Sequence, residues 1–399
     1  MAIPDFFRRV FDKRWRRTDV YNSVYGQKTE INTSTVQGQA DAYTRCPVVN
    51  TAIGVASRAH SNLKVRAVDK NGRDVDNQTV DADLKKLKRF NEYQNFRTFN
   101  LQLKTYLLIF GKAYVLKDKL IGVDKYYYYI IPNTVITPVY DLTGHDSMFN
   151  KKVSKYQVTV NGEVMYLSTK EVSVIYDSCF DFSEDGLGAS RLESLKEPVS
   201  TILSSLEAST QLHADGGARG IVVLGESDSD KLHNPLLEKE KENLQDSLKG
   251  YGLLRDKFKY IISKTAASFV PMTTKVVDMD IPAIYNIAEK AVYKVYGIPP
   301  IMGQDETRYK ALPEATSVLY TGSVIPEGVD IINALVELVG IPDRKWAYQP
   351  DWSHLDVFQE SLAKSANALT QAAQAINQLS QIESVTPEQI KYILEPYIR

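Results

Sequence analysis

The chain has 399 residues and a formal net charge of −1, because 48 lysines and arginines nearly balance 49 aspartates and glutamates. An apolar share of 43% is typical of a folded protein with a sizeable core and excludes disorder as the default state. The near-zero charge excludes a chain that grips nucleic acid along its whole length, since tight binding needs clustered cations that displace counterions from phosphates.

Membrane insertion and export are not predicted by the sequence. No run of about 18 apolar residues is present to span a bilayer, and the N-terminus lacks the apolar core of a signal peptide. The two cysteines, Cys46 and Cys179, stand alone and are not at metal-ligand spacing. We therefore expect a soluble protein that folds in a reducing compartment.

Residues 1–40 are predicted to be a basic N-terminal arm. Basic side chains alternate with Phe7, Phe11 and Trp15 at helical spacing between Arg8 and Arg17. Such a segment can contact nucleic acid, an acidic partner or a membrane face. The favoured interpretation is a solvated arm that orders only in an assembly, because chain termini generally behave in that way.

The first half of the chain has the pattern of an α+β domain with mostly antiparallel strand pairing, which we assign to residues 41–185. Helices are predicted from Pro47 to about residue 63 and over Phe96–Phe110, the second ending at Gly111. Strands are predicted over Lys64–Val68, Lys112–Leu116, Tyr126–Ile131 and Val172–Tyr176, with turns at Asp69–Gly72 and Asn161–Gly162.

From Gly186 onward the apolar period becomes helical. The stripe consists of Leu192, Leu195, Val199, Ile202 and Leu206, and it stops at Gly216-Gly217. Pro198 within this stripe predicts a kink or a late helix start. Strands at Gly220–Leu224 and Phe258–Ser263 then flank a charged helix from Asn234 to Gly250. This arrangement predicts a small strand–helix–strand insert between two long helices.

The second long helix is predicted from Ile281 to Val295, with Asp280 as the cap of its first turn. Gly297, Pro299 and Pro300 end it sharply. The segment Gln304–Lys310 that follows is polar and has no hydrophobic anchor. We expect it to project into solvent or into a cavity.

The last part of the chain is predicted to be helical. A stretch starting at Pro313 is interrupted by Pro326 and ends at Gly340, and Thr386-Pro-Glu-Gln389 is a capping box for a final short helix. Apolar residues recur at nearly coiled-coil spacing over Leu355–Ile382. A long, weakly charged helix of this kind needs helical neighbours, which other subunits would supply.

Motifs for catalysis are missing from the sequence. No Gly-Lys-Ser/Thr loop for nucleotide phosphates is present, and the five histidines are not at zinc-ligand spacing. Asp278 and Asp280 form the best carboxylate pair, but no third metal ligand is evident, and the same holds for Asp305 and Glu306. We predict a protein that is not an enzyme and has no metal and no cofactor.

Several motifs, in this order and spacing, carry a resemblance to a known family. They are Arg45-Cys-Pro-Val-Val-Asn-Thr-Ala-Ile53, Gly111-Lys-Ala-Tyr-Val115, Asp185-Gly-Leu-Gly-Ala-Ser190, Gly297-Ile-Pro-Pro-Ile-Met-Gly303, Ser323-Val-Ile-Pro326 and Ala347-Tyr-Gln-Pro-Asp-Trp352. Over roughly residues 45–399 the chain resembles the portal proteins of tailed double-stranded DNA bacteriophages, in the smaller family typical of long-tailed phages. Lys112 departs from the usual Asn, and a Tyr-Ser-Asn-like string after Gly303 is missing.

The resemblance implies an α+β fold that assembles as a ring, usually of twelve subunits, at one capsid vertex. It implies a wing at 41–185, stem helices at 186–217 and 276–297, a clip at 218–275, a tunnel loop at 298–312, a long helix returning to the wing at 313–353, and a helical crown at 354–399. The implied function is a channel through which double-stranded DNA is packaged and ejected.

The resemblance also implies partners and site residues. The partners are other copies of the chain, double-stranded DNA in the lumen, the large terminase, the head-completion adaptor, the major capsid protein and, as an open case, a scaffold protein, in the virion and, during assembly, in the host cytoplasm. The channel-lining residues would be Gln304, Asp305, Glu306, Thr307, Arg308, Tyr309 and Lys310. Gly297, Pro299, Pro300 and Gly303 would position that loop.

Lys290 and Lys294 lie one helical turn apart and off the apolar stripe. They are candidates for weak phosphate attraction on the stem lumen, and a plain solvated surface is an equal interpretation. Two other functions stay open from the sequence: a metal-dependent nucleic-acid-processing enzyme, and a capsid-interior scaffold that binds partners through residues 355–399.

Overall fold

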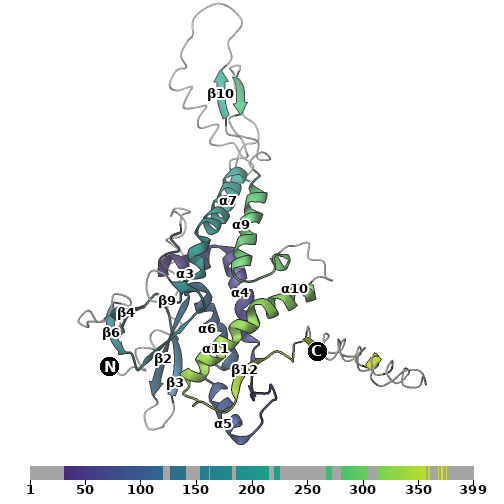
Figure 1. Cartoon of the computed structure of the whole chain (residues 1–399). Coiled ribbons are helices and arrows are strands. Elements are labelled where there is room, and N and C mark those ends of the chain that lie inside the picture. The colour runs from purple at the N-terminus through teal and green to yellow at the C-terminus, as the bar shows by residue number, and fades with distance from the viewer. Residues whose placement is uncertain are drawn as a thin grey trace, which may run out of the picture. The chain divides into compact units, whose positions relative to one another are not determined.

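The computed structural model describes residues 31–119, 126–140, 153–160, 162–181, 186–214, 220–224, 267–271, 280–303 and 312–355, with a few single positions up to 374 (Figure 1). The chain divides into two compact units. The first comprises Met1–Val55 and Thr105–Tyr296, and the second comprises Ala56–Lys104 and Gly297–Arg399. The boundary falls within helix α4 (Pro47–Ser61) and within helix α6 (Phe96–Phe110).

The core of the first unit lies between two three-stranded antiparallel sheets. One sheet has the order β3-β2-β7 and consists of β3 (Tyr126–Ile131), β2 (Lys112–Lys119) and β7 (Val172–Tyr176). The other has the order β4-β5-β6 and consists of β4 (Ile136–Tyr140), β5 (Val153–Val160) and β6 (Glu163–Ser168). Alternate residues of each strand point to one face, so both sheets can contribute an apolar face to one core.

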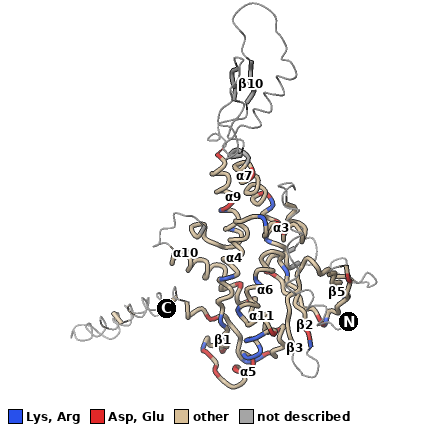
Figure 2. The backbone as a smooth tube through the Cα atoms, turned by 180° about the vertical axis from the view of Figure 1, so that it is seen from behind, with Lys and Arg blue, Asp and Glu red and all other residues tan. Residues whose placement is uncertain are grey.

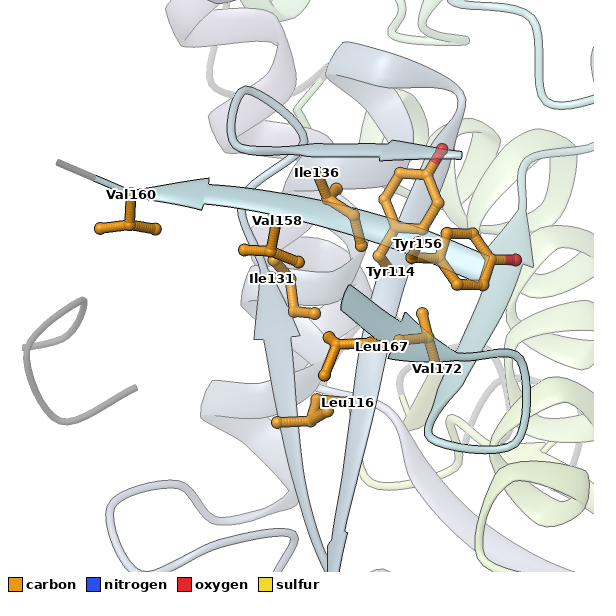
Figure 3. Close-up of a cluster of buried hydrophobic side chains, with 9 residues drawn as sticks. All are labelled: Tyr114, Leu116, Ile131, Ile136, Tyr156, Val158, Val160, Leu167 and Val172. Carbon is orange, nitrogen blue, oxygen red and sulfur yellow. The ribbon is translucent and has the colours of Figure 1, made fainter. Parts of the chain in front are cut away.

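Nine buried side chains fill this core (Figure 3). They are Tyr114, Leu116, Ile131, Ile136, Tyr156, Val158, Val160, Leu167 and Val172, and they come from all six strands. The rings of Tyr114 and Tyr156 meet edge to face at 5.7 Å between centroids. Because burying one such aliphatic side chain contributes about 1.5–3 kcal/mol, this cluster supplies much of the stability of the unit.

A close backbone approach joins the first of these sheets to the helices that follow. Gly111 has a φ of 73°, and an added Cβ would lie 2.3 Å from the carbonyl oxygens of both Gly188 and Ala189. The Arg191 guanidinium donates to both carboxylate oxygens of Asp177, at 2.6 and 3.0 Å, with both side chains more than nine-tenths buried. The junction therefore fixes where the next helix begins.

Beyond this junction the first unit is helical. The short 3-10 helix η1 (Arg191–Leu195) continues into α7 (Lys196–Ala214), which packs along α9 (Ile281–Val295) (Figure 1). Between these helices in sequence, β10 (Gly220–Leu224) and β11 (Ala267–Pro271) pair in antiparallel fashion, with Leu224 opposite Ala267. The unit also contains the two-residue strands β8 (Phe180–Asp181) and β9 (Gly186–Leu187), and helix α3 (Val36–Arg45), which Thr35 caps at Gly38.

The second unit combines helices with one strand pair. Strand β1 (Lys64–Val68) pairs with β12 (Ala347–Asp351), and the unit also contains α5 (Gln78–Leu87). One long helical stretch consists of α10 (Leu312–Leu319), the π-helical turn η4 (Tyr320–Val324) and α11 (Ile325–Leu338). Gly328 of α11 lies close to the pair, since an added Cβ would be 3.2 Å from both Leu63 and Trp352.

The structure confirms most elements that the sequence predicts. All described strand pairs are antiparallel, and the predicted strands and helices of the first half are present with nearly the predicted bounds. Pro198 is the third residue of α7, so the late helix start is the correct alternative. Of the arm predicted at 1–40, residues 1–30 lie outside the described residues, whereas residues 36–40 belong to helix α3. The charged helix at 234–250, the strand at 258–263 and most of the helix at 355–382 also lie outside the described residues.

Two predictions are wrong. Asp280 precedes α9 with a φ of 42° and makes no side-chain cap hydrogen bond. The second residue of the helix is a proline, which has no backbone N–H, so one of the donors that a capping side chain would satisfy is missing. The interruption of the last helical stretch lies at residues 320–324 and not at Pro326. The backbone N–H of Ile325 bonds to Tyr320 five residues earlier, and this wider turn accommodates the missing N–H of the proline that follows.

The close approach at Gly111 leads to a stability prediction. We expect Gly111→Ala to lower the free energy of unfolding by more than about 3 kcal/mol, since the new methyl group meets two immovable carbonyl oxygens. Gly162→Ala is the matched control, because Gly162 has a similar φ of 82° and open space around it, and should cost about 1–2 kcal/mol. Urea unfolding of both variants measures the difference, and equal losses would contradict the proposed close contact.

Candidate functional site

The predicted site residues fall into three groups. Lys290 and Lys294 lie in α9 of the first unit. The second group lies in the second unit, at the start of its segment Gly297–Arg399, and consists of Gly297, Pro299, Pro300 and Gly303. The predicted loop Gln304–Lys310 lies outside the described residues. The structure therefore shows the segments before and after the loop, and each of them has a distinct chemistry.

Helix α9 buries one side and exposes the other. Ala288, Val292 and Tyr293 are buried, and α9 packs along α7. Burial raises the pKa of Tyr293, and the nearby carboxylate of Glu289 raises it further, so this tyrosine stays neutral. The buried side of α9 therefore carries no charge at these three positions.

The exposed side of α9 carries two kinds of side chain. Lys290 and Lys294 are both exposed and lie one turn apart. Ile284 and Ile287 are 46% and 69% exposed, which is unusual for isoleucines in a packed helix. At 100° per residue, Ile287 and Lys294 lie only about 20° apart, so the isoleucines and the lysines share one exposed side, the isoleucines in its N-terminal half and the lysines in its C-terminal half. The N-terminal half of this side is suited to contact with an apolar surface, and the C-terminal half to weak attraction of anions.

Tyr296 anchors the C-terminal end of α9 within the first unit. Its side chain is 1% exposed, and its hydroxyl donates to the backbone oxygen of Leu108 at 3.4 Å. Burial is the main cause that raises the pKa of this hydroxyl, which therefore remains a hydrogen-bond donor. This role of Tyr296 was not predicted, although a tyrosine directly before a Gly-Ile-Pro-Pro break was the available signal in the sequence.

The segment before the predicted loop is compact. Gly297 has a φ of 66°, in the left-handed region where a glycine is favoured. An added Cβ would lie 2.8 Å from the hydroxyl of Ser323. After it, Ile298 is 2% exposed, and the chain enters the 3-10 turn η3 (Pro300–Gly303), with the N–H of Met302 donating to Pro299 at 2.9 Å. Both predicted glycines and both prolines thus belong to a rigid lead-in to residue 304.

The segment after the predicted loop is fixed through the π-helical turn. The hydroxyl of Ser323 donates to one carboxylate oxygen of Glu327 at 3.2 Å. The other carboxylate oxygen lies 2.7 Å from Lys104 Nζ and 3.2 Å from His60 Nε2. The Lys104 and His60 side chains are each only 1% exposed. A buried ammonium is stable only beside a hydrogen-bonded counter-charge, so Glu327 cannot move without a large penalty.

Aromatic packing adds to this anchor. The buried ring of Tyr320, the first residue of the π-helical turn, lies 5.4 Å from Trp352 and 6.0 Å from Phe358 between centroids. Burial raises its pKa, and a hydrogen bond with the side chain of Asn62 opposes that shift. Lys104, Glu327 and Tyr320 were not predicted as anchors, because their partners are distant in sequence.

The residues that the structure describes form no candidate metal centre. Within them, no group of three or more histidines, cysteines and carboxylates is placed to hold a metal ion. Asp280 is described, but Asp278, Asp305 and Glu306 lie outside the described part of the chain. None of the described helices has the length and hydropathy that crossing a bilayer requires.

Comparison with known proteins shows a family and a fold. The sequence model of the family described as "Phage portal protein" matches residues 47–381. Curated proteins yield no match. Among solved structures, one from the neck of an empty GTA particle computed with C6 symmetry has 15% identity and a TM-score of 0.56, covering 93% of this chain and 94% of the other.

Two further solved structures have the same fold. A chain from the neck of a native GTA particle computed with C12 symmetry has 16% identity and a TM-score of 0.54, covering 89% of this chain and 91% of the other. An HK97 family phage portal protein from Corynebacterium diphtheriae has 12% identity and a TM-score of 0.50, covering 78% of this chain and 94% of the other.

The lead-in at Gly297 gives a second prediction. We expect Gly297→Ala to lower the free energy of unfolding by about 1–3 kcal/mol more than Gly340→Ala, since the two glycines share nearly the same φ but only the first faces a neighbour. Thermal unfolding followed by circular dichroism measures both variants. Ser323→Gly, added to Gly297→Ala, should recover part of the excess loss, and no recovery would contradict the assigned contact.

Proposed function

This chain belongs to the phage portal protein family, and from that premise we propose how its parts form a DNA channel. In this proposal identical copies form a ring at one capsid vertex, usually of twelve subunits, through which double-stranded DNA enters and leaves. The C6 and C12 symmetries of the GTA neck relatives support a ring, although they describe those particles. Membership in a family of structural virion proteins agrees with the prediction of a non-enzymatic protein and gives no support to the enzyme or scaffold alternatives.

The observation that carries the proposal is the exposed side of α9, which is apolar in its N-terminal half and basic in its C-terminal half. A ring places each subunit between two neighbours and a central hole. The exposed isoleucines at 284 and 287 would then be covered by the next copy, while Lys290 and Lys294 would face the lumen. Lysines spaced along a helix attract phosphate weakly, so DNA can slide because no single contact is tight.

We assign the remaining parts in the same frame. Residues 41–185 form the wing, α7 and α9 belong to the stem, and residues 218–275 form the clip, which binds the large terminase and later the head-completion adaptor. Gln304–Lys310 form the tunnel loop, and residues 354–399 form the crown, on the capsid side. The rigid segments at Gly297–Gly303 and Tyr320–Glu327 support a loop that is held firmly at its base while its polar side chains meet DNA.

A ring test decides the proposal. Electron micrographs and native mass spectra of the purified full-length chain should show closed rings with an axial hole, and deletion of Gln304–Lys310 should leave the rings intact but abolish retention of packaged DNA. The deletion leaves the buried Glu327 anchor in place, so loss of rings is not expected from it. Only monomers over a wide range of concentration and salt would refute the proposal.

The stem lysines give a separate prediction. Lys290→Glu together with Lys294→Glu should lower the rate of DNA packaging on the order of tenfold, because repulsion replaces attraction along the path of the phosphates. Lys64→Glu with Lys170→Glu makes the same charge change at exposed positions elsewhere and should leave the rate unchanged. An equal drop in both variants would show that net charge matters and that the α9 face does not.

A further inference from the structure

The second unit carries a basic surface that the proposed channel does not use. It is formed by the end of α5, the connection to α6 and the turn before β12, and Figure 2 shows basic positions gathered around α5. We name as the α5 basic surface seven exposed residues: Lys85, Lys86, Lys88, Arg89, Arg97, Arg344 and Lys345. The acidic residues interspersed in these segments are Asp81, Asp83, Glu92 and Asp343. Cations thus outnumber carboxylates in a chain that is nearly neutral overall.

A buried carboxylate holds one side of this surface in place. The Asp83 side chain is only 3% exposed and accepts from Tyr348 at 2.9 Å and from the Arg344 guanidinium at 3.1–3.4 Å. Lys86 Nζ lies 3.8 Å from the same carboxylate. The Trp346 indole donates to Tyr348 at 3.3 Å, and the Arg344 guanidinium carbon lies 6.0 Å from the Trp346 ring centroid. One carboxylate therefore orders two surface cations and neutralises only part of their charge.

The connection from α5 to α6 is rigid. Asn91 accepts from the backbone N–H groups of Tyr93 and Gln94 at 2.9 and 2.8 Å, and the backbone N–H of Phe96 donates to Lys88 at 3.2 Å. Beneath it, Phe90 is fully buried and stacks on Phe99 at 4.1 Å between centroids. A loop that is already ordered does not lose further conformational entropy when a ligand binds.

The charges of this connection remain available to an anion. The Arg89 guanidinium donates to the backbone oxygens of Asn91 and Glu92, which fix its position without cancelling its charge. Arg97 stands in the first turn of α6, where the helix carries a partial positive charge and no acidic residue is present. A cation there does not stabilise its own helix. Tyr93 projects beside them with 74% of its surface exposed.

We propose that the α5 basic surface binds the phosphate backbone of double-stranded DNA at a second site, which DNA reaches without being threaded through the ring. The inference rests on the proposed function only in that double-stranded DNA is the anion this protein meets at high concentration. Lysine is depleted in protein–protein interfaces, whereas lysines and arginines at a rigid surface are typical of phosphate contacts. Among the described residues of this surface, Tyr93 is the only large hydrophobic side chain that is exposed.

Closed circular plasmid DNA tests this site, because it cannot thread through an assembled ring. Lys85→Glu, Lys88→Glu and Arg97→Glu are combined in the full-length chain, and Lys64→Glu, Lys70→Glu and Lys170→Glu form the control with the same charge change. Affinity is measured by co-sedimentation over a series of salt concentrations. We expect the first variant to lose affinity for the plasmid at least about tenfold at 100 mM salt. The slope of the logarithm of the binding constant against the logarithm of the salt concentration should decrease in magnitude by about 3, since each lost phosphate contact contributes about 0.9.

Three other outcomes would overturn the inference. Equal losses in the test and control variants would mean that only net charge matters. Wild-type rings that bind polyglutamate more tightly than plasmid at equal charge would identify an acidic protein as the partner. Rings that leave closed circular DNA unbound would refute the second site while the proposed channel stands. If no rings form, the channel proposal fails, and the same variants measured on monomers still decide whether this surface binds DNA. The glutamine versions of the three substitutions, checked by circular dichroism, separate charge loss from misfolding.

Discussion

The junction between the strands and the helices of the first unit depends on one steric constraint, the absence of a side chain at Gly111. Because the backbone there can approach the carbonyls of Gly188 and Ala189, the start of η1 lies directly against the end of α6 and the sheet that follows. The Arg191–Asp177 pair then fixes the angle with two charge-assisted hydrogen bonds. The direction of α7, and with it the side that α9 can expose, follows from this contact.

In the second unit, a buried ionic cluster fixes the position of a helix. Lys104, His60 and Ser323 all converge on the carboxylate of Glu327, one turn beyond a π-helical turn. Removal of one partner from a buried ion cluster costs several kcal/mol, whereas the intact cluster adds little net stability. Its value lies in specificity, since only one placement of the helical stretch that begins at Leu312 satisfies the buried ammonium of Lys104.

The sequence predicted what local signals encode. Periodicity placed α6, α9 and the strands β1, β2, β3 and β7, and the Gly297-Ile-Pro-Pro break placed the end of α9, because these features depend on neighbouring residues alone. It did not predict the pairing of β1 with β12, the Asp83 cluster or the Lys104–Glu327 pair, since their members are more than two hundred residues apart and no short pattern links them. The cap at Asp280 was wrong because a proline in the first turn changed which backbone groups need a partner.

The antiparallel pairing of β10 with β11 has a consequence for how such chains diversify. Leu224 and Ala267 are paired residues of these two strands. The two ends of the segment 225–266 are therefore attached to neighbouring points of the fold. Segments with neighbouring ends can be lengthened, shortened or exchanged at small entropic cost. Exchange of residues 225–266 alone could thus change the binding partners of such a chain, while α7 and α9 keep their packing.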